Sequence, residues 1–213
     1  MRMLLGNLAA IWRYPTKSLA AEPLTHAVIT PGGIPGDRAT QLVVRDGHAR
    51  AGKAYRGKED NLLHLTSSVD EARSIAAGRG VTVEAASGEG HYFDAAPLSL
   101  ILDTWLKGVS EHVGFDVEHE RYRPNFFIRA ADGIVLTEHA LVGRELRLGE
   151  VTLKVRKPIG RCVTTTYDQR TGESTPEILR YVAQERANEM GIYCDVLRAG
   201  TVRIGDSLEL LER

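Results

Sequence analysis

Four short segments of the chain combine positive charges or a thiol with residues that form tight turns. They span residues 14–18, 33–38, 121–125 and 157–162. Arginine makes forked, bidentate hydrogen bonds to phosphate, and lysine acts on anions as a compact point charge. Cysteine thiolates are ligands of soft metal centres. If the fold brings them together, these segments predict a site for a small anionic ligand that contains a phosphate and a metal.

The thiol of Cys162 and its neighbours supply the first candidate residues. Arg161 stands directly before Cys162, and a cation beside a thiol favours the ionised thiolate. Pro158 and Gly160 belong to the same loop, where backbone N–H groups can also face a ligand. The other candidates are cations suited to phosphate and polar side chains suited to the edge of a ring. They are Lys17, Ser18, Arg38, Arg123 and Asn125.

Each segment on its own also has an ordinary structural interpretation. Residues 14–18 are typical of a turn that ends in an exposed lysine, and residues 33–38 of a turn with a surface ion pair. Arg123 precedes a proline, which favours extended backbone. A lone cysteine is most often a small buried side chain, and we expect this of Cys194, which lies in an alternating apolar segment. The functional interpretation therefore depends on the four segments meeting in space.

Composition and charge exclude several classes of function. The 213 residues are 43% hydrophobic and 26% charged, which suits a packed globular core. The formal net charge is −1, without the basic surplus of a nucleic-acid binder. Two cysteines are too few for a disulfide framework, and no apolar run is long enough to span a bilayer. We expect a cytoplasmic protein with reduced thiols and with no nucleic-acid or membrane partner.

Common metal and nucleotide motifs are missing from the sequence. The seven histidines show no His-x-x-x-His or Glu-x-x-His spacing, and the cysteines form no Cys-x-x-Cys pair, which argues against zinc or di-iron sites. The glycine-rich residues 31–36 lack the Gly-Lys-Ser/Thr ending of a phosphate-binding loop. Neither a dinucleotide fingerprint nor an iron–sulfur cysteine cluster is present. A redox function would therefore need a separate electron donor.

Short apolar or alternating runs between Gly and Pro turns predict the elements that position these residues. Strands are predicted at residues 27–30, 41–44, 81–83, 145–148, 151–155 and 202–204. Helices are predicted at residues 68–77, 98–109 and 176–190. Many short strands at close spacing favour a closed or nearly closed barrel. The predicted fold class is mainly β with a few helices (α+β).

Taken in order along the chain, these and neighbouring segments resemble the MOSC family of molybdenum-cofactor proteins. The matching segments are Tyr-Pro-Thr-Lys-Ser at 14–18, the turn at 28–38, Arg-Tyr-Arg-Pro-Asn at 121–125, the strand pair at 142–149, Lys-Pro-Ile-Gly-Arg-Cys at 157–162, and the closing strands at 191–206. Any one of them is a weak signal. Their common order and their reach across the chain make the set specific.

The resemblance implies a domain layout, a cofactor and a set of site residues. Residues 1–90 would form a MOSC N-terminal-like β-barrel segment and residues 91–213 the MOSC domain, around one compact core. The implied ligand is the molybdenum cofactor, molybdopterin with its metal, and Cys162 is the implied catalytic residue and metal ligand. The family's polar helix start corresponds here to residues 102–105, so Thr104 is the expected substitute. The other implied cofactor-binding residues are Lys17, Ser18, Arg38, Arg123, Asn125 and Arg161.

Three functions remain open at this point. In the favoured one, the protein is an oxidoreductase that reduces small N-hydroxylated compounds with electrons from a separate partner. In the second, it carries the molybdenum cofactor, or a sulfur atom bound to Cys162, to an acceptor without catalysis of its own. In the third, the barrel has lost the metal and binds another anion or a protein, and Cys162 is buried and faces away from Arg38 and Arg123.

Overall fold

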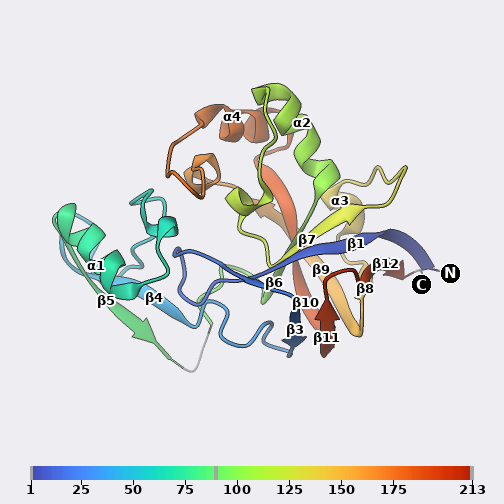
Figure 1. Ribbon diagram of the computed structural model, residues 1–213, viewed down its shortest axis with the longest axis horizontal. Helices are drawn as coiled ribbons and strands as arrows, with labels where there is room; N and C mark the ends of the chain where they lie inside the picture. Colours follow the sequence, from blue (N-terminus) through green and yellow to red (C-terminus); the bar gives the residue numbers. More distant parts are fainter. Residues whose placement is uncertain (1, 89–90, 212–213) are drawn as a thin grey trace.

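The computed structural model describes residues 2–88 and 91–211, and its main part is a closed seven-stranded β-barrel (Figure 1). The barrel closes because the last strand pairs with the first. In order around the ring, the strands are β1 (Arg2–Arg13), β7 (Phe126–Ala130), β6 (Leu98–Leu102), β10 (Glu189–Arg198), β9 (Val151–Gly160), β8 (Glu145–Leu148) and β12 (Ser207–Leu211). The predicted mainly β fold with a closed barrel is confirmed.

The barrel is held together by side chains that alternate between its inside and its outside. Along β8 and β9 the inward-facing residues Leu146, Leu148, Val151, Leu153 and Val155 are buried and belong to the central hydrophobic cluster. Closure gives every strand of the ring two hydrogen-bonded neighbours, which removes exposed sheet edges. Among the strands outside the ring, β2 (Glu22–Leu24) pairs with β1, and β3 (His26–Ile29) pairs with β11 (Gly200–Arg203).

The predicted helix at residues 98–109 is wrong for its first five residues. Leu98–Leu102 form β6, which pairs with β10 on one side and runs parallel to β7 on the other. All five side chains are buried, so the run shows no alternation that would distinguish it from a buried helix. The helix α2 (Asp103–Val113) begins only at Asp103. The carboxylate of Asp103 accepts a hydrogen bond from the backbone N–H of Ala130 at 2.9 Å.

The predicted C-terminal helix is shorter than expected. The helix α4 (Pro176–Glu185) begins with a proline, whose fixed φ suits the first turn. It ends at Glu185, since Ala187 and Asn188 have left-handed backbone with φ of 51° and 61°. Shorter helical elements are α3 (Glu138–Leu141) and the 3-10 turns η1 (Leu63–Leu65), η2 (His119–Tyr122) and η3 (Val163–Thr166). No helix among the described residues is long and apolar enough to cross a membrane.

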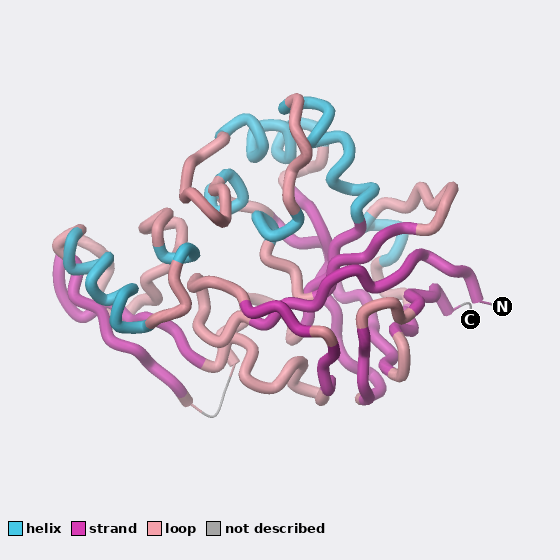
Figure 2. The backbone as a smooth tube through the Cα atoms, in the orientation of Figure 1, coloured by secondary structure: helices cyan, strands magenta, loops and turns pink. Residues whose placement is uncertain are grey.

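A smaller lobe stands beside the barrel, as the backbone tube in Figure 2 shows. Its strands β4 (Thr40–Gly47) and β5 (Val81–Ser87) pair with each other, and α1 (Val69–Gly78) packs on them. The hydroxyl of Ser68 caps α1, as expected of serine at this position. The lobe has a hydrophobic cluster of its own, separate from that of the barrel. The predicted domain boundary at residue 90 lies outside the described residues, so the division stays a prediction.

Candidate functional site

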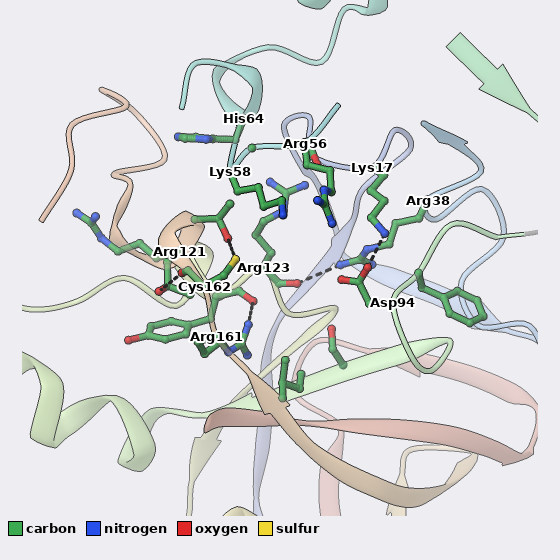
Figure 3. A pocket seen from close by; sticks show the side chains of 18 of the residues that line it. Lys17, Arg38, Arg56, Lys58, His64, Asp94, Arg121, Arg123, Arg161 and Cys162 are labelled. Atoms are coloured by element: carbon green, nitrogen blue, oxygen red, sulfur yellow. Dashed lines mark hydrogen bonds and ion pairs between the residues drawn. The ribbon is translucent and has the colours of Figure 1, made fainter. Parts of the chain in front are cut away.

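A cavity lies between the barrel and the smaller lobe, and the four segments singled out from the sequence meet at it (Figure 3). Residues 157–162 reach it from the end of β9, and residues 121–125 from η2 and the loop before β7. Residues 14–18 and 33–38 reach it from the loops that follow β1 and β3. Seven of the eight predicted site residues line it: Lys17, Ser18, Arg38, Arg123, Asn125, Arg161 and Cys162.

The wall of this cavity is strongly positive. Among the described residues, its lining includes seven lysines and arginines but one acidic residue, Asp94. The Nζ of Lys17 pairs with a carboxylate oxygen of Asp94 at 2.5 Å. The other lining cations are Arg38, Arg56, Lys58, Arg121, Arg123 and Arg161. Such an excess of one charge in a confined space attracts small anions.

Three lining residues have backbone in the left-handed region, where residues other than glycine are uncommon. Ser18, Arg38 and Arg123 have φ of 73°, 48° and 51°. Hydrogen bonds hold this geometry, because the N–H of Arg38 donates to the carbonyl of Tyr14 at 2.6 Å and the N–H of Arg123 to that of Glu120 at 3.0 Å. A left-handed backbone conformation costs free energy in residues other than glycine, and such residues are found most often at functional sites. It aims two guanidinium groups at the same cavity.

Tyr14 is a buried platform for these two guanidinium groups. The Cζ atoms of Arg38 and Arg123 lie 4.5 and 4.3 Å from the centroid of its ring, within cation–π range. The N–H of Tyr14 donates to Asp37 at 2.7 Å, and its hydroxyl donates to the carbonyl of Pro124 at 3.1 Å. Asp37 also pairs with Arg38. Burial raises the pKa of Tyr14, so its ring stays neutral beneath the cations.

Arg123 and Arg161 have no acidic partner in the part of the chain that the structure describes. Arg123 donates through Nη2 to the carbonyl of Leu19 at 2.6 Å, whereas its Nη1 is buried with no hydrogen-bond partner there. Arg161 donates to the carbonyls of Met190 and Tyr122 at 2.7 and 2.8 Å. Burial lowers the pKa of both guanidinium groups to about 10, so both remain charged at neutral pH. Partly buried, unpaired charges favour an anionic ligand.

Cys162 presents an exposed thiol to the cavity. It directly precedes η3, and its Sγ lies 3.1 Å from Oγ1 of Thr164. Cys194 is buried in the barrel core as predicted, and burial raises its pKa, so it is held as a thiol. Cys162 is therefore the cysteine that a ligand can reach. Its exposure in the cavity that Arg38 and Arg123 also line is the opposite of the arrangement expected for a barrel that has lost its metal.

Asn125 lines the cavity, but its amide is already bonded within the protein. Its Oδ1 accepts hydrogen bonds from the N–H and the hydroxyl of Ser99, both at 3.0 Å, and its Nδ2 donates to the carbonyl of Trp12 at 3.2 Å. These bonds connect the start of β7 to β6 and β1. The amide therefore fixes the wall of the cavity, and its direct contact with a cofactor stays a prediction.

Thr104 is the predicted site residue that the structure places elsewhere. It is exposed in the first turn of α2 and lines a separate hollow together with Phe115, Asp116 and Arg129. The helix start that carries it continues from β6 away from the cavity, so this geometry gives no support for a role at the cofactor. The expectation depended on matching residues 102–105 to the polar helix start of the family, and the sequence departs from the family pattern at these residues.

The structure also brings to the cavity residues that the sequence did not single out. Arg56, Gly57 and Lys58 come from a loop of the smaller lobe, His64 from η1, and Tyr193 from β10. The lobe residues belong to no motif and to no periodic run. They reach the cavity only because the lobe packs against the barrel, which no local pattern reveals. Only Tyr193 could have been found from the sequence, because it lies within residues 191–206, which resemble the closing strands of the family.

His119 connects the wall of the cavity to the barrel. Its ring stacks on that of Phe127 with centroids 3.8 Å apart. Its Nε2 accepts a hydrogen bond from the indole N–H of Trp12 at 3.0 Å, and its Nδ1 lies 3.1 Å from a carboxylate oxygen of Glu120. Burial lowers the pKa of His119, although Glu120 and Glu118 oppose that shift. Protonation would also set a second N–H against the indole N–H, so the neutral ring fits this position.

The neutral His119 predicts a pH-dependent stability. The unfolded chain takes up a proton near the ordinary pKa of 6.5, whereas folded His119 does so at lower pH. The contribution of His119 to the free energy of unfolding is therefore fully present above pH 6.5, and it is lost as the pH falls toward the pKa of the folded state. His64, whose pKa burial also lowers, acts in the same direction. We expect the free energy of unfolding, measured with urea, to fall less between about pH 7 and about pH 5 in His119→Phe than in wild type. Equal falls in the two proteins would contradict a lowered pKa for His119.

The fold and the cavity together define a class of protein: a closed β-barrel with a cationic, thiol-bearing cavity at its side. The particular family follows from the sequence. Residues 87–209 match the sequence model of the MOSC domain, and the chain belongs to the MOSC family. This family is associated with the molybdenum cofactor. The predicted family membership is confirmed.

Solved structures resemble this one over nearly its whole length. The YuaD protein of Bacillus subtilis matches with a TM-score of 0.58 at 15% identity, covering 99% of this chain and 97% of its own. YiiM from Geobacillus stearothermophilus matches with a TM-score of 0.50 at 11% identity, covering 100% of this chain and 76% of its own. At these identities the likeness shows the fold alone. A search of curated proteins found no match.

Proposed function

We propose that this chain binds the molybdenum cofactor in the cavity, with Cys162 as a metal ligand, and reduces N-hydroxylated compounds. The observation that carries the proposal is an exposed thiol in a cavity whose described lining has seven lysines and arginines against one carboxylate. Membership of the MOSC family supports the identity of the cofactor. The reductase activity is the finer part of the proposal, and it needs its own test.

The residues present fit such a cofactor. The buried Nη1 of Arg123 has no hydrogen-bond partner among the described residues, and a phosphate oxygen would supply one. The guanidinium of Arg161 is met by carbonyl oxygens and by no carboxylate there. A thiolate at Cys162 suits a soft metal centre. The residues proposed to hold the cofactor are Lys17, Ser18, Arg38, Arg123 and Arg161.

When bound, the cofactor supplies two-electron oxygen-atom chemistry. Reduction of an N–OH group takes two electrons and two protons, breaks the N–O bond and releases water. The chain's own part is to bind and to orient. His64 belongs to the wall of the cavity, where its Nε2 donates to the carbonyl of Asp168 at 3.1 Å. Burial lowers the pKa of His64, so the neutral ring is favoured and the two protons are expected to come from solvent.

The proposal is tested by loading the protein with cofactor and supplying a chemical reductant. We expect amidoximes or other N-hydroxylated compounds to be converted to the dehydroxylated product in the loaded protein and not in the cofactor-free protein. A chemical reductant replaces the partner that donates electrons, so the test does not depend on finding that partner. Stoichiometric metal without turnover of any N-hydroxylated compound would show that the enzymatic part is wrong.

The exposure of Cys162 also favours a second candidate function, a carrier that passes cofactor or sulfur to an acceptor protein. A thiol that faces solvent can be reached by a partner, and it can hold sulfur as a persulfide. In this case radiolabelled sulfur placed on Cys162 would move to an acceptor enzyme. Reductase turnover without such transfer would support the first function over the second.

A further inference from the structure

Arg56 and Lys58 add a second group of cations to the cavity, on the side formed by the smaller lobe. Their side chains are 40% and 44% exposed, whereas that of Arg38 is 15% exposed. Figure 3 shows their charged ends directed toward that of Arg123, on the side of the cavity opposite the end of β9. A ligand that enters from solvent can therefore meet these two cations without displacing the wall.

The loop that carries these cations is a tight, anchored turn. The N–H groups of Glu59 and Asp60 both donate to the carbonyl of Arg56, at 2.9 and 3.2 Å. The carboxylate of Glu59 accepts from the N–H and the Nη2 of Arg56 and lies 3.7 Å from Nζ of Lys58. Glu59 does not line the cavity, so it holds both cations from outside it. Asp60 is buried and pairs with Arg79 at 3.1 Å, which fixes the turn to the lobe.

The same loop packs directly against the segment that carries the thiol. A Cβ added to Gly57 would lie 3.2 Å from Cγ2 of Thr164, so the backbone at Gly57 approaches that residue closely. The hydroxyl of Thr164 lies 3.1 Å from the sulfur of Cys162. Since Arg56 and Lys58 are the two neighbours of Gly57 in the chain, both cations flank the approach to the sulfur.

The positive charge at this place is not balanced within the described residues. The Nε of Arg56 is buried and has no hydrogen-bond partner there. The single carboxylate of Glu59 is shared by Arg56 and Lys58. Arg123, which has no acidic partner among the described residues, faces these two cations. Converging charges of one sign repel each other, and a bound anion relieves that repulsion.

We propose that Arg56 and Lys58 form an anion subsite that selects substrates with a carboxylate or phosphate group close to the N–O bond. The role in substrate selection rests on the proposed reductase function, whereas the anion subsite itself does not. The cofactor's own phosphate has the same chemistry as such a substrate group. The experiments therefore separate the presence of the subsite from the source of the anion that it binds.

The first experiment uses cofactor-free protein and two alkylating reagents, iodoacetate and iodoacetamide. In both reactions the Cys162 sulfur forms a bond to the methylene carbon and iodide leaves. The reagents differ in carrying a carboxylate or a neutral amide, so the ratio of their rates cancels any change in the thiolate fraction. Cys194 is buried and does not compete, and Cys162→Ser gives the background rate. The ratio thus measures how strongly the protein attracts a carboxylate to the sulfur.

We expect the double variant Arg56→Gln/Lys58→Gln to lower this rate ratio about fivefold at low salt, and less at high salt, because exposed charges are screened. The matched control is Arg50→Gln/Lys53→Gln, which removes the same charges from exposed residues of the same lobe outside the cavity. Its ratio should stay close to that of wild type. A wild-type ratio in Arg56→Gln/Lys58→Gln would overturn the subsite, whether or not the cofactor binds.

The second experiment identifies the source of the anion. Cofactor-loaded wild type and Arg56→Gln/Lys58→Gln are compared on an aryl amidoxime and on its ring-carboxylated analogue, and their molybdenum contents are measured. We expect equal molybdenum and an about fivefold lower ratio of kcat/KM for the carboxylated over the neutral substrate in the variant. Molybdenum lost together with the two charges would overturn substrate selection, because the cations would then hold the cofactor. Turnover of neither substrate by loaded wild type would refute the reductase function and leave the alkylation result standing.

Discussion

Arg121→Met is expected to lower the free energy of unfolding by about 3 kcal/mol, because it breaks a buried charge network. The side chain of Arg121 is 4% exposed. It donates to Glu118 at 2.9 Å, to Asp168 at 3.0 Å and to the carbonyl of Thr166 at 2.8 Å. Methionine fills a similar volume but leaves all three acceptors without this donor. Urea unfolding at neutral pH measures the effect.

A matched variant separates burial from the mere presence of an ion pair. Arg170→Met removes a guanidinium that contacts the same Glu118 at 3.1 Å, but the side chain of Arg170 is 79% exposed. We expect this change to cost less than about 1 kcal/mol, as exposed pairs do. Equal destabilisation by the two variants would contradict the account. A large effect of Arg121→Met alone would show that the arginine holds η2 to η3, and so keeps the segments of Arg123 and Cys162 together.

Arg123→Gln is expected to reduce the cofactor content of the purified protein by at least about tenfold. The guanidinium stacks on Tyr14, has one orphaned buried N–H group, and faces the cavity without an acidic partner among the described residues. A charge-assisted bond from such a group to a phosphate is among the stronger single contacts a protein makes. Glutamine keeps a hydrogen-bond donor but loses the charge and the fork. Pterin fluorescence after release of the cofactor measures the content.

Two further variants test the reason for that loss. Arg123→Lys keeps the charge but not the fork, and we expect an intermediate cofactor content. Arg129→Gln removes the same charge from an exposed position on β7 that does not line the cavity, and its content should equal that of wild type. A full content in Arg123→Gln would mean that the cofactor, if bound, lies away from this guanidinium.

The local elements that surround the site were largely predictable from the sequence. Alternation predicted β8 and β9, Pro176 predicted the start of α4, and the helix predicted at residues 68–77 matches α1 closely. The segments with Lys17, Arg38, Arg123 and Cys162 were singled out by residue type and turn chemistry, and the structure brings them to one cavity. These segments could be singled out because the affinity of cations for anions, and of thiols for metals, depends on residue type and not on the fold.

Features set by long-range packing could not be predicted in this way. Residues 98–102 are buried on both faces of the barrel wall, so their spacing carried no strand signal. Arg56 and Lys58 reach the cavity only through the packing of the smaller lobe on the barrel. Thr104 was expected at the cofactor from an alignment alone, and the turn from β6 into α2 places it elsewhere. In each case the deciding contacts join residues distant in sequence.

The most direct test of the central claim is the molybdenum content of wild type and Cys162→Ser, measured by mass spectrometry after expression in a host that makes the cofactor. We predict molybdenum in the wild-type protein and a loss of at least about tenfold in the variant, since even an outer partner of a metal ligand is worth that much. Cys162 is exposed, so the substitution should not disturb the fold. Equal molybdenum in both proteins would contradict the claim that this sulfur binds the metal.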